Sequence, residues 1–129
     1  MLSERRKDRS GETYAAVRKQ LAAIARDGEF RTVLIADCDG LVIAASNNDP
    51  INDSLGVLGV HYFYKRESNE LVPEKTFVLR NRKDHSSIIV HSFTLVDQRV
   101  LLMALAKDVK SIHPLVNRAV SGAKRILEN

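Results

Sequence analysis

The sequence predicts one α+β domain, in the order αββαβββα, built on a five-stranded antiparallel sheet. Two apolar runs, at 33–36 and 41–45, flank Asp39-Gly40 as the strands of a β-hairpin flank their turn. Because the first run is apolar without alternation, both faces of that strand need cover. The run at 99–106 has the same property. We therefore expect two central strands, with the first and last helices on one face of the sheet and the middle helix on the other.

Length and composition are those of a single globular domain, with 129 residues, 44% hydrophobic and 28% charged. The charged start has no apolar core of a signal peptide, and the longest apolar run, at 100–106, is too short to cross a bilayer. We expect a cytoplasmic protein that does not insert into membranes. The single cysteine, Cys38, excludes an internal disulfide. We predict that residues 1–11 form a disordered basic tail and that residues 12–129 form the folded domain.

A first helix and the hairpin follow this tail. Apolar side chains at spacings of three and four predict a helix after Ser10-Gly11, with the single stripe Tyr14, Val17, Leu21 and Ile24. Gly28 is a natural C-terminal cap for that helix. In the hairpin, Asp39-Gly40 favours a two-residue type I′ turn, because both residues accept positive φ values.

The middle helix begins at Asp49-Pro50, an N-cap followed by proline at the first helical position, and extends to about Lys65. At 100° per residue, its apolar side chains form two opposite faces. We expect contact with the sheet from Ile51, Leu55, Leu58 and Tyr62. The opposite face carries Val57, Val60 and Tyr64. Between the faces, Gly56 and Gly59 indicate a close backbone approach, or else an irregular helix that ends early.

Three strands and a helix complete the chain. The strand at 75–80 places Phe77 and Leu79 on one face, and on the other Thr76, Val78 and Arg80. The next strand, at about 87–96, directs inward His91, Phe93 and Leu95. A turn at Asp97-Gln98 leads into the central strand at 99–106. The last helix starts near Val109, with Pro114 in its first turn.

Two segments resemble the roadblock/dynein light chain domain family. They are the hairpin Val33 to Ser46, VLIADCDGLVIAAS, and the run Val100 to Ala106, which continues through Lys107-Asp108-Val109 into the last helix. The resemblance implies dimers in which middle helices pack together and third strands pair into one continuous sheet. It also implies regulation of small Ras-like GTPases, or scaffolding of motor and signalling complexes, and bacterial members act on a polarity GTPase. Residues 56–75 depart most from the alanine- and leucine-rich middle helix of the family.

The second apolar face of the middle helix gives an independent reason to expect a dimer. A helix that is apolar on both faces in so small a domain needs a contact beyond its own sheet. The strand at 75–80 is expected to be an edge whose backbone groups need a partner. We therefore predict a non-enzymatic homodimer that binds another protein, with a small GTPase as the expected partner. The predicted interface comprises Val57, Val60, Tyr64, Thr76, Val78 and Arg80.

The main enzymatic alternative uses the hairpin. The segment 34–42, LIADCDGLV, resembles the first motif of haloacid dehalogenase-type phosphatases, in which the first aspartate, here Asp37, attacks phosphorus. The second, Asp39, would act as general acid and base beside magnesium. These phosphatases have threonine where this chain has Leu41, and they need a later acidic pair. We therefore interpret both aspartates as turn residues.

The histidines and basic residues suggest no further chemistry. The four histidines fall in different elements without a metal-ligand spacing: His61, His85, His91 and His113. His91 is interpreted as a core histidine, and it is the one candidate for a profilin- or PAS-like ligand pocket, the second alternative. The stretch at 61–66, HYFYKR, is too short to predict nucleic-acid binding. We assign no catalytic residue, metal ligand or cofactor.

Overall fold

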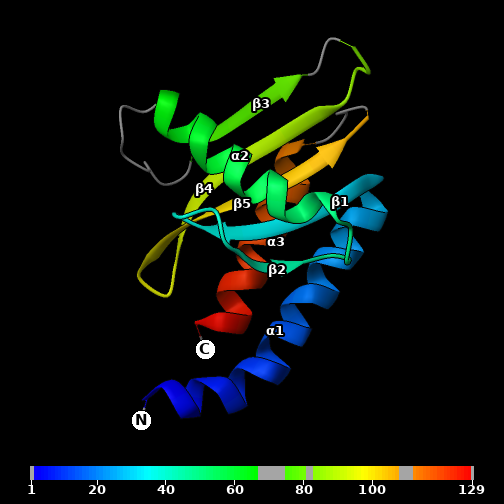
Figure 1. Cartoon of the computed structure of the whole chain (residues 1–129). Coiled ribbons are helices and arrows are strands. Elements are labelled where there is room, and N and C mark those ends of the chain that lie inside the picture. Colours follow the sequence, from blue (N-terminus) through cyan, green and yellow to red (C-terminus); the bar gives the residue numbers. More distant parts are fainter. Residues whose placement is uncertain (1, 67–74, 81–82, 108–111, 129) are drawn as a thin grey trace.

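A computed structural model describes residues 2–66, 75–80, 83–107 and 112–128, with side chains described for 13–63, 75–80, 83–107 and 114–128. Within these ranges the chain forms helices and strands in the predicted order αββαβββα (Figure 1). The elements are α1 (Leu2–Asp27), β1 (Phe30–Asp37), β2 (Val42–Ala45), α2 (Ile51–Arg66), β3 (Thr76–Arg80), β4 (Ser87–Leu95), β5 (Gln98–Ala106) and α3 (Ile112–Leu127). The predicted α+β class is confirmed.

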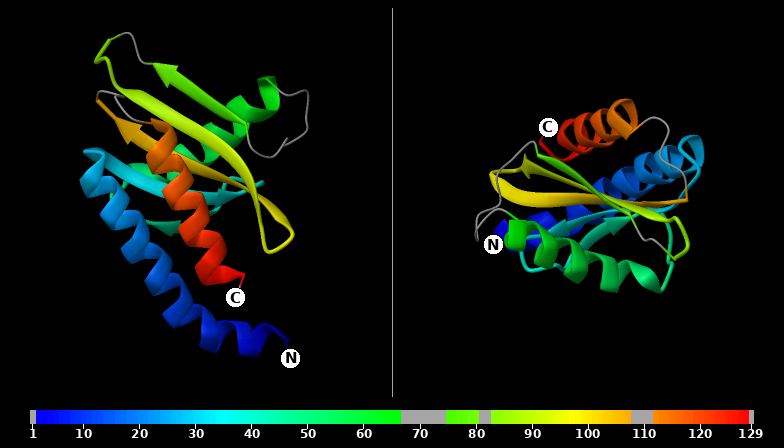
Figure 2. Two further views of the ribbon diagram at one scale, coloured as in Figure 1. Left: turned by 180° about the vertical axis from the view of Figure 1, so that it is seen from behind. Right: turned by 90° about the horizontal axis from the view of Figure 1, so that it is seen from above.

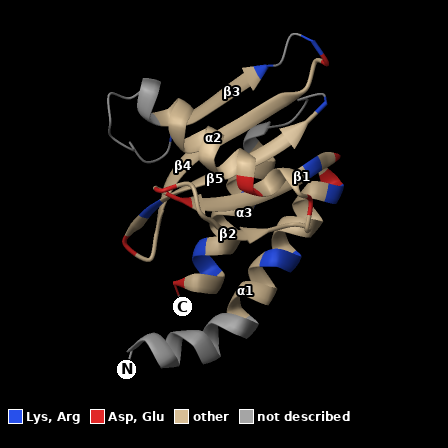
Figure 3. Cartoon of the chain, in the orientation of Figure 1, with Lys and Arg blue, Asp and Glu red and all other residues tan. Residues whose placement is uncertain are grey.

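The five strands form one antiparallel sheet in the order β2-β1-β5-β4-β3. The continuously apolar strands β1 and β5 are neighbours inside the sheet, with Ile35 opposite Leu102, which confirms both as central strands. Charged residues lie at the ends of these two strands and not along their middles (Figure 3). The two edges of the sheet are β2 and β3.

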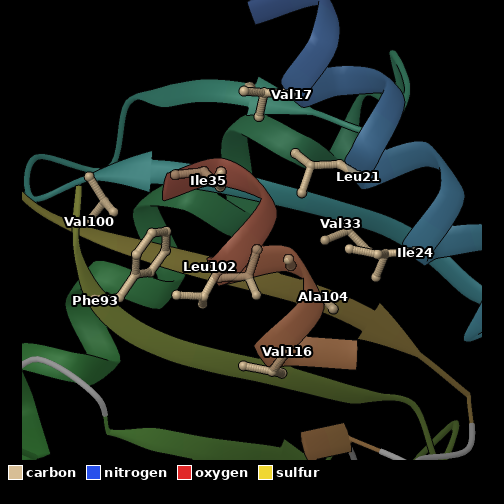
Figure 4. Close-up of a cluster of buried hydrophobic side chains, with 14 of the residues drawn as sticks. Val17, Leu21, Ile24, Val33, Ile35, Phe93, Val100, Leu102, Ala104 and Val116 are labelled. Atoms are coloured by element: carbon tan, nitrogen blue, oxygen red, sulfur yellow. The ribbon is translucent and has the colours of Figure 1, made fainter. Parts of the chain in front are cut away.

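Helices cover the two faces of the sheet unequally. Figure 2 shows α1 and α3 side by side on one face and α2 alone on the other, as predicted. Under α1 and α3 lies a core that includes Leu21, Ile24, Ile35, Phe93 and Leu102 (Figure 4). Under α2 lies a second core that includes Leu34, Leu55, Phe63, Leu101 and Met103. Leu34 and Ile35 are adjacent in β1 and belong to different cores, so both faces of that strand are covered.

Helix α1 begins at Leu2, so the expected start after Ser10-Gly11 is wrong. The segment before Gly11 is rich in Glu, Arg and Lys, whose unbranched side chains favour helix without needing an apolar stripe. In Figure 1 this part of α1 extends beyond the sheet and past the end of α3. The boundary between tail and domain at residue 12 stays a prediction. None of the helices in the described ranges has an apolar stretch long enough to cross a membrane.

Both hairpin turns differ from the expected ones. Between β1 and β2, Gly40 alone has a positive φ, of 87°, and its N–H donates to the Asp37 carbonyl at 3.0 Å. This geometry is a type I turn followed by a bulged glycine, so the type I′ turn predicted at Asp39-Gly40 is wrong. The β4–β5 hairpin instead has consecutive positive φ values, 49° at Val96 and 62° at Asp97. Its turn lies one residue before the predicted position.

Candidate interaction surface

The N-terminus of α2 is fixed to strand β1 through one carboxylate. Asp49 Oδ1 accepts a hydrogen bond from the N–H of Ile51 at 3.0 Å, which caps the helix. Its two oxygens also pair with Arg31, with Nε to Oδ2 at 2.7 Å and the second nitrogen to Oδ1 at 3.1 Å. The hydrogen bond from Arg31, and then that from Ile51, holds the pKa of Asp49 below its ordinary value.

A buried polar cluster sets the first turn of α2 against the sheet. The hydroxyl of Thr32, in β1, lies 2.7 Å from Asn52 Oδ1 and 3.1 Å from Asn47 Oδ1. Asn52 in turn donates from Nδ2 to the Asn47 carbonyl at 2.9 Å. Thr32 and Asn52 are both buried, so these hydrogen bonds satisfy groups that would otherwise destabilise the fold. The cluster fixes the rotation of α2 about its own axis.

Two glycines bring α2 close to the sheet. A Cβ atom at Gly56 would collide with the Gly40 carbonyl oxygen in the β1–β2 turn. A Cβ atom at Gly59 would collide with the side chain of Met103 in β5. The predicted close approach is therefore confirmed. Helix α2 continues through both glycines to Arg66, so the alternative of an early end is wrong.

The glycine side of α2 is also its buried side, which corrects the predicted faces. Val60 is only 8% exposed and packs in the core with Leu55 and Phe63, so its expected outward position is wrong. The ring of Phe63 meets Phe77 of β3 edge to face, with centroids 5.4 Å apart. Because α2 is apolar nearly all round, its sequence period does not single out the sheet-facing side.

The outward side of α2 presents apolar side chains to solvent, interspersed with exposed Asp53, Ser54 and His61. Val57 is 61% exposed, as predicted, whereas Leu58 and Tyr62 were expected to face the sheet and are exposed instead. Leu41, 68% exposed in the β1–β2 turn, follows Gly40, which packs on the backbone of Val57. We call the set Leu41, Val57, Leu58 and Tyr62 the α2 apolar surface. The Tyr64 side chain lies outside the described residues.

Sequence reasoning missed Leu41 because it was counted with the apolar run of the second strand. The available signal was its position immediately after Gly40 in a tight turn, where polar residues predominate. Strand β2 in fact begins at Val42.

The edge strand β3 has β4 as its one neighbour in the described sheet. Phe77 and Leu79 pack on the α2 core, and the opposite face carries the predicted set Thr76, Val78 and Arg80. Val78 is 44% exposed, Arg80 is exposed, and Thr76 Oγ1 lies 2.6 Å from Nδ1 of His91. The predicted face and edge position of β3 are therefore confirmed.

His91 occupies the core position predicted for it. The residue is buried in β4, and its ring stacks on Phe93 with centroids 6.2 Å apart. Its Nδ1 contacts Thr76 across the β3–β4 pair.

The aspartates of the hairpin stabilise their own turn. Asp37 Oδ1 accepts hydrogen bonds from the N–H groups of Asp39 at 2.9 Å and Leu41 at 3.0 Å. This is the local pairing that makes aspartate a common turn residue, and it confirms the interpretation of Asp37 as a turn residue. Among the described residues, no three His, Cys, Asp or Glu side chains are grouped as a metal site would require.

Comparison with known proteins finds solved structures with a similar architecture. No family model matches the sequence, and no curated protein matches it. Among solved structures, the gliding protein MglB from Thermus thermophilus superposes with a TM-score of 0.70 at 17% identity, over 90% of this chain and 91% of that one. An MglB with a tetrameric arrangement gives 0.70 at 18% identity, over 90% of each chain.

A roadblock/LC7 domain from Streptomyces avermitilis extends the likeness beyond MglB. It superposes with a TM-score of 0.59 at 13% identity, over 83% of this chain and 91% of that one. These superpositions, together with the observed order of helices and strands, establish the fold. The resemblance inferred from the hairpin and the last strand is confirmed at this level: the chain has the fold of a roadblock-type domain.

Proposed function

We propose that this chain is a non-enzymatic, homodimeric interaction module that regulates or scaffolds a small Ras-like GTPase or a signalling or motility complex. The observation that carries the proposal is the α2 apolar surface on a domain with the fold of MglB. Exposed apolar side chains that cluster on one helix mark a protein contact more often than an open surface. A second copy supplies an identical apolar surface, as two-fold dimers require.

The proposed dimer places α2 against its symmetry mate and β3 beside its copy. Pairing of β3 strands satisfies the N–H and C=O groups that an edge strand leaves open. Thr76, Val78 and Arg80 lie on one face of that strand. Of the predicted helix residues, Val57 and Tyr64 remain in the proposed interface, whereas buried Val60 gives way to Leu58 and Tyr62.

The GTPase partner is supported by the roadblock-type fold and by the sequence resemblance on the hairpin. The hairpin aspartates support a binding role over phosphoryl transfer, because the carboxylate of Asp37 is engaged by two backbone N–H groups of its turn.

The dimer is tested by mass at micromolar concentration, using sedimentation or light scattering. Val57→Asp places a charge at the proposed two-fold contact and should give a monomer that keeps its fold. Asn117→Asp, exposed on α3, makes the same charge change on the opposite face and should stay dimeric. A monomeric wild type, or a dimeric Val57→Asp protein, contradicts the α2 contact.

The GTPase role is tested with purified Ras-like GTPases of the source organism, loaded with GDP or with a non-hydrolysable GTP analogue. We expect complex formation by mass with one nucleotide state in preference to the other. The regulatory role is contradicted if none of the GTPases forms a complex with the chain in either nucleotide state.

A further inference from the structure

Positive charge is concentrated on one side of the sheet. The described side chains of α1 and α3 include one acid, Asp27, and six cations: Arg18, Lys19, Arg26, Arg118, Lys124 and Arg125. The described side chains of this helical layer therefore have a formal charge of +5. The other described side chains, with six cations and eight acids, sum to −2. Figure 3 shows the blue segments of α1 and α3 and the red segments on α2 and the β1–β2 turn.

Five of the six cations of this layer are exposed, and Lys124 is half-buried. Leu21 of α1 and Ala119 of α3 are buried in the core, whereas Arg18, Lys19 and Arg125 are exposed. We call the set of six cations the basic face.

Three cations of the basic face make no ion pair with another described side chain. Asp27 contacts Arg118 at 3.1 Å and Arg26 at 3.8 Å, at one end of the layer. Glu128, just after α3, accepts a hydrogen bond from the N–H of Val96 at 3.0 Å. Arg18, Lys19 and Arg125 have no ion pair within the described structure. Their charge is therefore available to an external anion.

The composition of this face favours one kind of partner. The exposed large apolar side chains of the described chain are Leu41, Val57, Leu58, Tyr62, Val78 and Val96, and none belongs to α1 or α3. A protein interface normally has an apolar or aromatic centre, and single-stranded nucleic acid needs aromatic platforms. Base readout in duplex DNA needs an element that inserts into a groove, whereas α1 and α3 lie side by side as one broad layer on the sheet (Figure 2). A plane of phosphate headgroups needs only distributed cations.

We infer that the basic face of α1 and α3 is a docking surface for the anionic headgroups of a lipid bilayer. Binding is peripheral and electrostatic, because the described parts of α1 and α3 carry no exposed large apolar side chain for insertion, and on that face of the sheet only Val78 of the edge strand β3 is exposed among the large apolar side chains described. This goes beyond the proposed function and holds for a single chain. In the proposed dimer, side-by-side β3 strands would put both basic faces on the same side of one sheet, and a membrane would meet both together.

The experiment is co-sedimentation with vesicles of phosphatidylserine and phosphatidylcholine, and with phosphatidylcholine alone, at about 0.05 M and about 0.5 M salt. The full chain should bind the anionic vesicles at low salt and be released at high salt. Lys19→Glu combined with Arg125→Glu should weaken binding at least about tenfold. The matched control, Arg99→Glu with Lys107→Glu, makes the same net change at exposed sites outside the layer and should weaken it less than about twofold.

Three outcomes overturn the inference. The first is that the full chain does not bind anionic vesicles at low salt. The second is that the two double variants lose binding equally, which would mean that only net charge matters. The third is that the chain binds duplex DNA in preference to vesicles at equal phosphate concentration, which would assign the face to nucleic acid. Circular dichroism verifies folding, and mass verifies the oligomeric state of each variant, so failure here is distinguishable from failure of the proposed dimer.

Discussion

Gly56 of α2 faces the carbonyl oxygen of Gly40 in the β1–β2 turn, with no room between them for a Cβ atom. The contact joins a helix to a turn backbone to backbone. It also explains a glycine in mid-helix, where alanine would favour the helix by about 1 kcal/mol.

Gly56→Ala should therefore destabilise the protein despite its better helix propensity. Overpacking at a tight contact typically costs about 1–3 kcal/mol, and Gly40 is held in its turn by the hydrogen bond from its N–H to the Asp37 carbonyl. Urea denaturation measures the loss. Ser54→Ala, at an exposed site of the same helix, is the control and should be neutral or slightly stabilising. A Gly56→Ala protein as stable as the parent would contradict the close contact.

Val57 and Val60 should respond differently to the same substitution. Val60→Asp buries an uncompensated charge in the α2 core and should lower the free energy of unfolding by about 3 kcal/mol or more. Val57→Asp, at an exposed site, should leave the monomer within about 0.5 kcal/mol. Thermal melting of the two variants at equal concentration, with the mass of each verified, compares them. Equal destabilisation would mean that the rotation of α2 is misassigned.

Removal of residues 1–9 should leave the melting temperature nearly unchanged. This segment has no periodic apolar content, and its part of α1 extends beyond the sheet. A calorimetric scan of the shortened chain is the measurement. A fall of many degrees would show that the segment packs and that the domain boundary at residue 12 is wrong.

The β4–β5 turn should gain stability from Val96→Asn. A β-branched residue with φ of 49° is strained, whereas asparagine accepts that conformation and suits a type I′ turn. The expected gain is about 1 kcal/mol in urea denaturation. Val96→Thr keeps the β-branch and is the matched control, with no gain expected. If both substitutions changed the free energy of unfolding equally, relief of backbone strain at Val96 would not be the cause.

The Arg31–Asp49 pair should make stability depend on pH in acid. The folded state holds the pKa of Asp49 below its ordinary value of 3.8, so the pair contributes fully above that value. Its contribution is lost as the pH falls through the lower, folded-state pKa. The stability difference between the wild type and Asp49→Asn, measured by urea at several pH values, should shrink on acidification below about pH 4. A difference that is constant from neutral pH to about pH 2 would show that the charge of Asp49 has no role.

The sequence predicted the sheet better than it predicted the middle helix. Unbroken apolar runs at β1 and β5 require cover on both faces, and that requirement alone places them centrally. Helix α2 is apolar nearly all round, so Val60 and Leu58 were assigned to the wrong sides. Their places depend on Gly40 and Met103, which are distant in sequence and contact the glycine side of the helix.

The types of the two hairpin turns could not be predicted from the sequence either. A type I′ turn was expected at Asp39-Gly40 from local preference, yet positive φ values at two successive residues occur at Val96 and Asp97. There the long pairing of β4 with β5 fixes the register. The two residues between Leu95 and Gln98 must therefore adopt the conformation that the turn requires. Tertiary pairing overrides local preference at that hairpin.

The strand order also determines when the fold can form during synthesis on the ribosome. β5 lies between β1 and β4, so the sheet is divided until residues 98–106 have left the exit tunnel. Before then, β1 is paired only with the short β2, and its other edge is open along an apolar strand. Until β5 emerges, such an open edge is prone to pair with a wrong strand. The nascent chain should therefore acquire protease resistance late and in a single step, after β5 emerges.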